Sequence, residues 1–245
     1  MLVIAQINQK GGVGKTTLGF HLAHRARELG RRTLVVDLDS QGNLTTALLG
    51  RDDLLNETGG ADLLFTATAA PAIRTTPVSE GLELLHGHRR LDAIEGDFDP
   101  HQAATHQRGL LRSLPYDVVI LDTPPTIGKR MVAAMLWTDL TLIPIEPASF
   151  SVAGLTSTLE MLGSARRLNP GLSYRVVVNR FNRGSKAQKA RIDRISQSIE
   201  VPEPYFTQRS AVAEAVEIGL PVWRYRRADR ALRELWSGFA REILG

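Results

Sequence analysis

KGGVGKTT, at residues 10–17, is the most informative stretch of this sequence. It follows a short apolar run and leads into a stretch whose apolar residues have helical spacing. Glycines let a loop turn its backbone N–H groups onto phosphate oxygens, and the positive end of the following helix faces the same charge. In such a loop the lysine contacts the β- and γ-phosphates and the next hydroxyl binds magnesium. We therefore predict a phosphate-binding loop with Lys15 and Thr16 in these roles.

The loop departs from the usual spacing at one position. The pattern GxxxxGK[ST] requires a glycine at position 9, where this chain has Gln9. A plain glycine-rich turn between a strand and a helix is the alternative, but it would not require the lysine and both threonines. The residues predicted to bind nucleotide here are Gly11, Gly12, Val13, Gly14, Lys15, Thr16 and Thr17.

Around the loop, short apolar runs alternate with helical patterns, which is typical of βαβ units and a mainly parallel sheet. The predicted strands are Leu2–Ile7, Thr33–Leu38, Leu82–Leu85, Asp117–Leu121, Leu140–Ile145 and Tyr174–Val178. The predicted helices begin at Thr16, Asn43, Ala103, Lys129, Ser151, Ser185, Ser210 and Ala228. Residues 51–81 are rich in Gly, Thr, Ala and Pro and predict a helical or irregular excursion over the sheet. We see no linker or repeat, so we predict one α/β domain over residues 1–245, with helices on both faces of a twisted sheet.

The amino-acid composition limits the class of protein and the kind of metal site that this chain can form. The chain has 245 residues, 43% of them hydrophobic, enough for a full core. No apolar run approaches the roughly 20 residues that span a bilayer, and we see no signal peptide, so we expect a cytoplasmic protein. The absence of cysteine excludes disulfides, thiol catalysis and thiolate-bound metal, so a metal would need oxygen or histidine ligands, which favours magnesium.

Charge is distributed unevenly along the chain. Residues 175–245 carry 14 Lys and Arg against 8 Asp and Glu, while residues 1–174 carry 16 against 18. A basic surface for a partner therefore belongs to the C-terminal third.

With its additional lysine, Lys10, the loop resembles the deviant Walker A box of the ParA/MinD ATPases. The resemblance implies a P-loop ATPase in which Lys10 reaches across a dimer interface to the phosphates of the partner's ATP, giving an ATP-dependent sandwich dimer. The alternative for Lys10 is an ordinary solvated loop charge. On this resemblance Lys10, Lys15 and Asp39 are the predicted catalytic residues, and ATP and Mg²⁺ are the predicted cofactors.

Two further segments support the resemblance. DLDSQGN, residues 37–43, is similar to the family's DxDPQGN segment with Ser40 in place of proline, and implies that Asp39 positions the attacking water while Asp37 helps to organise magnesium. The alternative is that Asp39 and Asn43 only cap the next helix. VVILDTPP, residues 118–125, resembles the Walker B box and implies that Asp122 holds magnesium, through water.

The base-binding residues are predicted from weaker matches. VVVNRF, residues 176–181, is similar to the family strand that ends in an adenine-reading asparagine, which makes Asn179 and Arg180 candidates. An ordinary turn asparagine is the alternative. FTQRS, residues 206–210, faintly matches a later family stretch and places Phe206 near the base. The switch helix after Walker B differs from the family, because Ala133 stands where asparagine is usual.

Three function classes match such a switch. A ParA-like partition or positioning ATPase would coat nucleoid DNA as an ATP dimer, while an adaptor carrying cargo stimulates hydrolysis. A MinD-like regulator would lie on a membrane. The third class, relatives of the nitrogenase iron protein, needs cluster thiolates that this chain lacks.

The C-terminal third favours the DNA class. Phosphate neutralisation by basic side chains gives sequence-independent DNA affinity, although a solvated basic face is the alternative. The candidate DNA-binding residues are Arg183, Lys186, Lys189, Arg191, Arg194, Arg224, Arg226, Arg227 and Arg230. The strand that begins at residue 2 leaves no room for an N-terminal helix-turn-helix, so we do not expect operator recognition. The apolar stripe of the last helix, which includes Trp236 and Phe239, either docks on the core or lies on a membrane. Plasmid, chromosome, carboxysome and chemotaxis-cluster cargoes all remain open.

Overall fold

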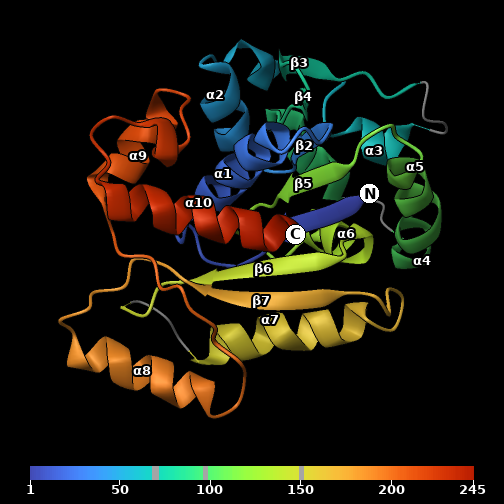
Figure 1. The fold of residues 1–245 in the computed structure, drawn as a ribbon. Helices are drawn as coiled ribbons and strands as arrows, with labels where there is room; N and C mark the ends of the chain where they lie inside the picture. The colour runs from blue at the N-terminus through green and yellow to red at the C-terminus, as the bar shows by residue number, and fades with distance from the viewer. Residues whose placement is uncertain (68–71, 96–98, 149–151) are drawn as a thin grey trace.

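The computed structural model describes residues 1–67, 72–95, 99–148 and 152–245. Their centre is a seven-stranded sheet in the order β3-β4-β2-β5-β1-β6-β7 (Figure 1). Neighbouring strands are parallel except for β3 and β4, which are antiparallel. The strands are β1 Leu2–Gln6, β2 Thr33–Asp37, β3 Thr76–Ser79, β4 Leu82–Leu85, β5 Val118–Asp122, β6 Leu140–Ile145 and β7 Ser173–Val178.

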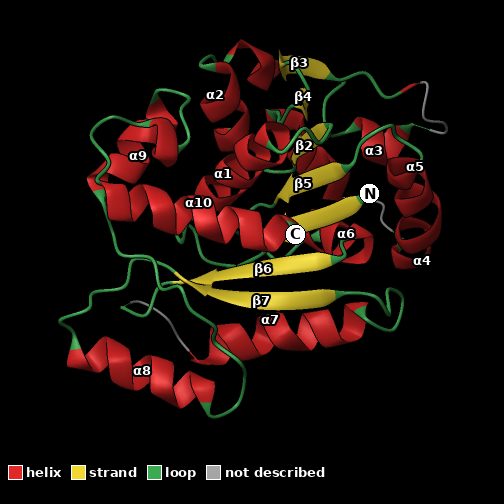
Figure 2. Ribbon diagram, in the orientation of Figure 1, coloured by secondary structure: helices red, strands yellow, loops and turns green. Residues whose placement is uncertain are grey.

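Helices cover both faces of this sheet, as Figure 2 shows. Successive residues of a strand point to opposite faces, so Ile4 joins the core beneath α1 and α10 while Val3 and Ala5 join the core beneath α6 and α7. The helices are α1 Lys15–Glu28, α2 Asn43–Leu49, α3 Leu63–Thr66, α4 Pro100–Gln102, α5 Arg108–Arg112, α6 Lys129–Trp137, α7 Val152–Ala165, α8 Lys186–Ser196, α9 Ser210–Glu217 and α10 Arg230–Leu244. The 3₁₀-helical segments are η1 Asp53–Asn56, η3 Arg89–Glu95 and η5 Val222–Arg224, and η4 Ala103–Gln107 is π-helical.

The predicted α/β architecture is confirmed, and each of the six predicted strands is present within one residue at either end. The prediction missed β3, which lies inside the excursion at residues 51–81. This strand is four residues long, contains Pro77 and pairs only on the edge, where proline is tolerated. So short an edge strand has no apolar run to reveal it.

Two helix starts were predicted two or three residues too early or too late, because a capping aspartate sets the first residue of each helix. The helix expected from Ala103 begins at Pro100, because the Asp99 carboxylate accepts a hydrogen bond from the His101 amide at 2.9 Å. The helix expected from Ala228 begins at Arg230 behind the capping carboxylate of Asp229. The predicted start at Ser151 lies outside the described residues.

The last helix, α10, packs on the core. Its apolar stripe is buried, with Trp236 2% and Phe239 3% exposed, and the Trp236 ring lies 4.5 Å from that of Phe206. Of the two alternatives for this stripe, docking is therefore the one found in the structure. Among the described residues no helix is both long and apolar enough to cross a bilayer.

Candidate nucleotide-binding site

The loop between β1 and α1 depends on glycine at two positions. Gly12 and Gly14 have positive φ angles of 75° and 102°, which other residues adopt only under strain. A Cβ on Gly14 would also lie 2.3 Å from Nδ2 of Asn179. The loop is joined to β6 through Asn8, whose side-chain amide donates to the Pro144 carbonyl at 2.7 Å. Sequence reasoning overlooked Asn8, although a polar residue directly between strand and loop was its signal.

Lys15 opens α1 with its ammonium turned back onto the loop. Its Nζ donates to the carbonyl oxygens of Asn8 at 3.0 Å and Lys10 at 3.3 Å, and the side chain is buried. Burial lowers the pKa of Lys15, while the nearby charges of Asp122 and Asp39 act in the opposite direction. A buried cation whose hydrogen-bond partners in the described residues are carbonyl oxygens would gain from an anion such as phosphate.

Two carboxylates lie side by side at the ends of adjacent strands. Asp37 on β2 and Asp122 on β5 are register partners, and both are almost fully buried. The Thr16 hydroxyl donates to Oδ2 of Asp122 at 2.7 Å, while Oδ1 of Asp122 is buried without a hydrogen-bond partner among the described residues. Burial, and next the charge of Asp37, raises the pKa of Asp122 to about 8. Burial raises the pKa of Asp37 to about 6.

These features fit a hard cation. An unpartnered buried carboxylate oxygen beside a hydroxyl and a second carboxylate is an oxygen donor set of the kind that Mg²⁺ prefers. The described residues contain no group of three or more His, Cys, Asp or Glu that could hold a metal by themselves. Mg²⁺ commonly binds through one or two carboxylates, substrate phosphates and water, so Thr16, Asp37 and Asp122 suit it.

Asp39 lies in a turn that the structure holds tightly. Its Oδ1 accepts from the Gln41 amide at 3.0 Å, and its own amide donates to Oδ1 of Asp37 at 3.2 Å. A Cβ on Gly87 would lie 2.6 Å from the Asp39 carbonyl, so the chain after β4 presses against this turn. The N-cap of α2 is Gly42, and the side chain that accepts from an amide of its first turn is that of Asp37, at Thr45. The alternative in which Asp39 and Asn43 merely cap α2 is therefore wrong.

A second residue missed by sequence reasoning is Thr45. Its amide and its hydroxyl both donate to Oδ2 of Asp37 at 2.8 Å, and its hydroxyl accepts from the Gly87 amide at 2.8 Å. Thr45 therefore orients Asp37 from the first turn of α2. Nothing in the local pattern distinguishes it from the neighbouring Thr46.

A pocket of about 210 Å³ lies beside the loop and is lined by Gly14, Thr17, Asn179, Arg180, Thr207, Gln208, Arg209, Ser210, Val212, Ala213 and Trp236. Two predicted base contacts, Asn179 and Arg180, thus come together with the loop. The Asn179 amide donates to the Val13 carbonyl at 2.8 Å, and Arg180 has a positive φ of 53°. Phe206 requires a correction, because its side chain is 1% exposed in the core and does not line this pocket. It positions the pocket wall formed by the residues that follow it.

Lys10 lies at the open side of the loop. Its side chain is 44% exposed, and its Nζ is 4.0 Å from Oε2 of Glu146, which is also 3.9 Å from the Arg180 guanidinium. The lysine is therefore placed on the surface, within reach of a molecule that contacts this face.

The basic residues fall into two separate groups. The first, on and just before α8, is exposed, and Ile192 and Ile195 anchor that helix on its other side. The second group consists of Arg224, Arg226, Arg227 and Arg230. Three of these arginines have carboxylate partners: Arg224 pairs with Glu28 at 2.7 Å, Arg227 with Glu214 at 3.8 Å and Arg230 with Glu234 at 2.7 Å. The α8 group, namely Arg183, Lys186, Lys189, Arg191 and Arg194, therefore has the less neutralised charge.

Known proteins resemble this chain along most of its length. A family model described as an AAA domain matches residues 1–174. The chromosome partitioning protein ParA of Caulobacter vibrioides is 30% identical over 235 residues, which cover 91% of this chain and 86% of that protein. A Cyanothece McdA variant in complex with ATP superposes with a TM-score of 0.83 at 21% identity, covering 100% of this chain and 96% of its own. The septum site-determining protein MinD of Pyrococcus horikoshii with Mg-ADP gives 0.72 at 23% identity, with coverages of 99% and 95%.

Proposed function

This chain belongs to the ParA/MinD family of P-loop ATPases, and from that membership we propose that it is an ATP-dependent dimerising switch that binds duplex DNA without sequence preference. Hydrolysis of ATP, stimulated by an adaptor protein, would release the DNA and so partition or position a cargo. The observation that carries the proposal is the Thr16–Asp122 hydrogen bond beside the buried Lys15, in a chain whose relatives include a chromosome partitioning protein.

The loop supplies binding and orientation. The backbone from Gly11 to Thr17 would enclose the phosphates, Lys15 would exchange its carbonyl partners for phosphate oxygens, and Thr16 with Asp122 and Asp37 would hold Mg²⁺. Mg²⁺, when bound, neutralises charge on the phosphoryl oxygens. Asp39 would hold the attacking water and accept its proton.

Dimerisation would depend on Lys10. Its exposed ammonium lies on the open face of the loop, where a second copy could place its ATP. Each copy would then complete the other's site, and bound ATP would be required for the pair to persist. ATP occupancy thereby sets the oligomeric state.

DNA contact is assigned to the α8 group defined above. Two copies in one dimer would present two basic surfaces, which raises the affinity without any new contact. The nucleoid would then be the place where the ATP form resides. The second basic group contributes less, because three of its arginines already pair with carboxylates.

The test is paired co-sedimentation with random-sequence duplex DNA and with anionic liposomes, each in ATP and in ADP. We expect DNA to be bound only in ATP, with log affinity falling against log salt at a slope of roughly −5 if about 6 phosphates are neutralised. Replacing Arg183 and Lys186 with alanine should weaken binding to unrelated sequences equally, whereas Arg167→Ala, an exposed arginine elsewhere, should not. Binding to liposomes alone would favour a MinD-like membrane regulator instead.

A further inference from the structure

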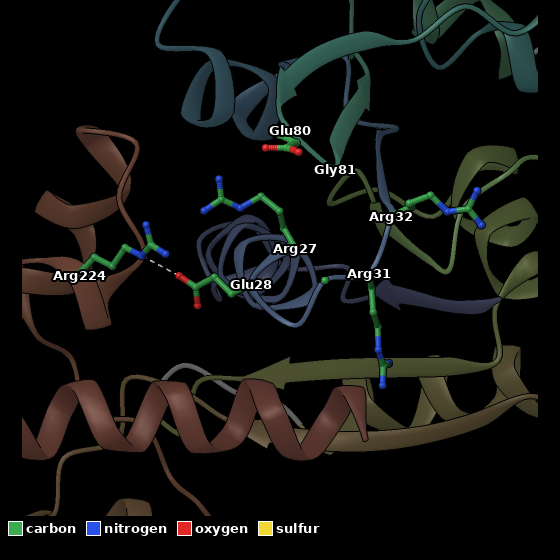
Figure 3. A pocket seen from close by; sticks show the side chains of 8 residues that line it. Arg27, Glu28, Arg31, Arg32, Glu80, Gly81 and Arg224 are labelled. Atoms are coloured by element: carbon green, nitrogen blue, oxygen red, sulfur yellow. Dashed lines mark ion pairs between the residues drawn. The ribbon is translucent and has the colours of Figure 1, made fainter.

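A pocket of about 600 Å³ lies at the far end of α1 from the phosphate-binding loop. Because α1 has 14 residues and rises about 1.5 Å per residue, its two ends are about 20 Å apart. The pocket is lined by Arg27, Glu28, Gly30, Arg31, Arg32, Glu80, Gly81 and Arg224 (Figure 3). We propose that it binds a phosphate-bearing anion. This inference does not rest on the proposed function.

Arg27 is the central cation of the pocket. Figure 3 shows its side chain in the space between Arg224 and Glu80. Its guanidinium donates to the Ser79 hydroxyl at 3.1 Å, and it forms no ion pair with any carboxylate in the described ranges. A half-buried arginine with only a neutral partner retains donors for an anion.

The Glu28 carboxylate does not neutralise the charge of Arg27, because it already pairs with two other arginines. Its carboxylate pairs with Arg224 at 2.7 Å and with Arg25 at 3.0 Å, and it accepts from the indole of Trp223 at 3.0 Å. The single negative charge of Glu28 is therefore already shared by the guanidinium groups of Arg25 and Arg224, and Arg27 adds a further positive charge. The pKa of the neighbouring His24 is lowered to about 3, by burial first and next by the positive charge of Arg27.

The last carbonyl groups of α1 are partly occupied by amides of the chain that follows. Gly30, with a φ of 74°, reverses the chain so that the amides of Gly30 and Arg31 bond to the carbonyls of Arg27 and Ala26. Arg32 is excluded from the proposal, because it pairs with Asp117 and points away from the other arginines in Figure 3. Arg31 is held by the backbone oxygens of Leu244 and Gly245 at 2.5 and 2.8 Å, beside the end of α10.

Guanidinium groups from separate segments match the oxygens of a phosphate group, which accepts paired N–H donors. The volume falls within the range of small-ligand sites. Among the residues that the structure describes, no aromatic side chain lines the pocket, so the phosphate, and not a stacked base, is the recognised part. The phosphate can belong to a free metabolite or to the backbone of duplex DNA.

The experiment is isothermal titration of inorganic tripolyphosphate into protein whose loop is already saturated with Mg-ADP. Wild type should bind, and Arg27→Ala should bind at least about tenfold more weakly, the effect of one lost charge-assisted hydrogen bond. Glu80→Gln should bind more tightly than wild type, because it removes a negative charge that has no ion-pair partner among the described residues. A gain of affinity cannot arise from misfolding.

Arg167→Ala is the matched control, since it removes the same charge from an exposed site on another face. Absence of wild-type binding, an unchanged Arg27→Ala, or an equal loss in Arg167→Ala would each overturn the assignment. A parallel titration with duplex DNA, on protein saturated with a nonhydrolysed ATP analogue and Mg²⁺ because DNA binding is expected only in that state, identifies the source. If DNA loses affinity in Arg27→Ala, the ligand is the DNA backbone; if its affinity is unchanged in that variant, the ligand is a free phosphorylated anion.

Discussion

Replacing Phe239 with alanine tests whether α10 is an integral core helix, and hence whether a membrane could use its apolar face. The Phe239 ring is 3% exposed, meets Phe206 edge-to-face at 5.0 Å and 82°, and lies 5.4 Å from the Arg175 guanidinium. Removing a buried phenylalanine costs roughly 3–5 kcal/mol, because contacts are lost and a cavity remains. We expect the free energy of unfolding to fall by about 4 kcal/mol.

The assay is urea unfolding of the nucleotide-free protein followed by circular dichroism. With an m-value of about 3 kcal/mol/M, the midpoint should fall by about 1.3 M. Arg241→Ala, at an exposed position on the same helix, is the control and should stay within about 0.5 kcal/mol of wild type. A loss below about 1 kcal/mol for Phe239→Ala would refute the argument, because it would mean that the ring is not packed in solution.

Four further predictions concern the nucleotide site. Lys10→Ala should still bind nucleotide but sediment as a monomer with a nonhydrolysed ATP analogue, and a dimer of this variant would contradict the role given to the lysine. Asp39→Ala should bind ATP and release phosphate at least about 100-fold more slowly, as expected when a general base is lost, so wild-type turnover would remove Asp39 from the mechanism. Gly14→Ala should weaken ATP binding about tenfold or more in calorimetry, since its φ of 102° and the 2.3 Å approach to Asn179 both strain the variant. Gly163→Ala, in α7 and away from the loop, where nothing lies within 4 Å of the new Cβ, should bind like wild type. Asp122→Asn should stabilise the ligand-free protein at pH 8 but not at pH 4. Burial raises the pKa of Asp122 in the folded protein to about 8, so the wild-type protein loses stability as the pH rises from the unfolded pKa to the folded one, whereas the amide does not titrate. Equal pH profiles of the two proteins in urea unfolding would show that the carboxyl is not buried as described.

The sequence was sufficient to place the ends of the strands that build the site. Asp37 and Asp122 each follow a run of apolar residues, and the carboxyl ends of parallel strands meet at one edge of a sheet whatever the strand order. That β2 and β5 are neighbours, with these two residues in register, was not predictable, because strand order depends on packing between distant segments. The raised pKa values follow first from the burial of both carboxyl groups in the finished fold, and so could not be predicted either.

Motif similarity misplaced a side chain where tertiary packing decided its direction. Phe206 lies beside the end of β7, where its amide donates to the Val178 carbonyl at 2.8 Å, so its position along the chain was sound. Its ring turned inward because Trp236 and Phe239, some thirty residues later, provide an apolar surface for it. A short segment carries no information about a surface built by a later helix.

The same limit explains the basic residues of the C-terminal third. Counting charges along the chain treats Arg224 as an available cation, whereas Glu28, at the end of α1, pairs with it at 2.7 Å. The sequence around Arg224 contains no acid that predicts this pairing. The charge count therefore overestimates how basic the surface around Arg224 is in the folded protein. On α8 the reverse holds: the helix is amphipathic over its own length, Ile192 and Ile195 face the core, and its basic residues must face outward. A charge pattern is therefore informative where one helix determines both its buried and its exposed side, and misleading where a distant helix supplies the counter-ion.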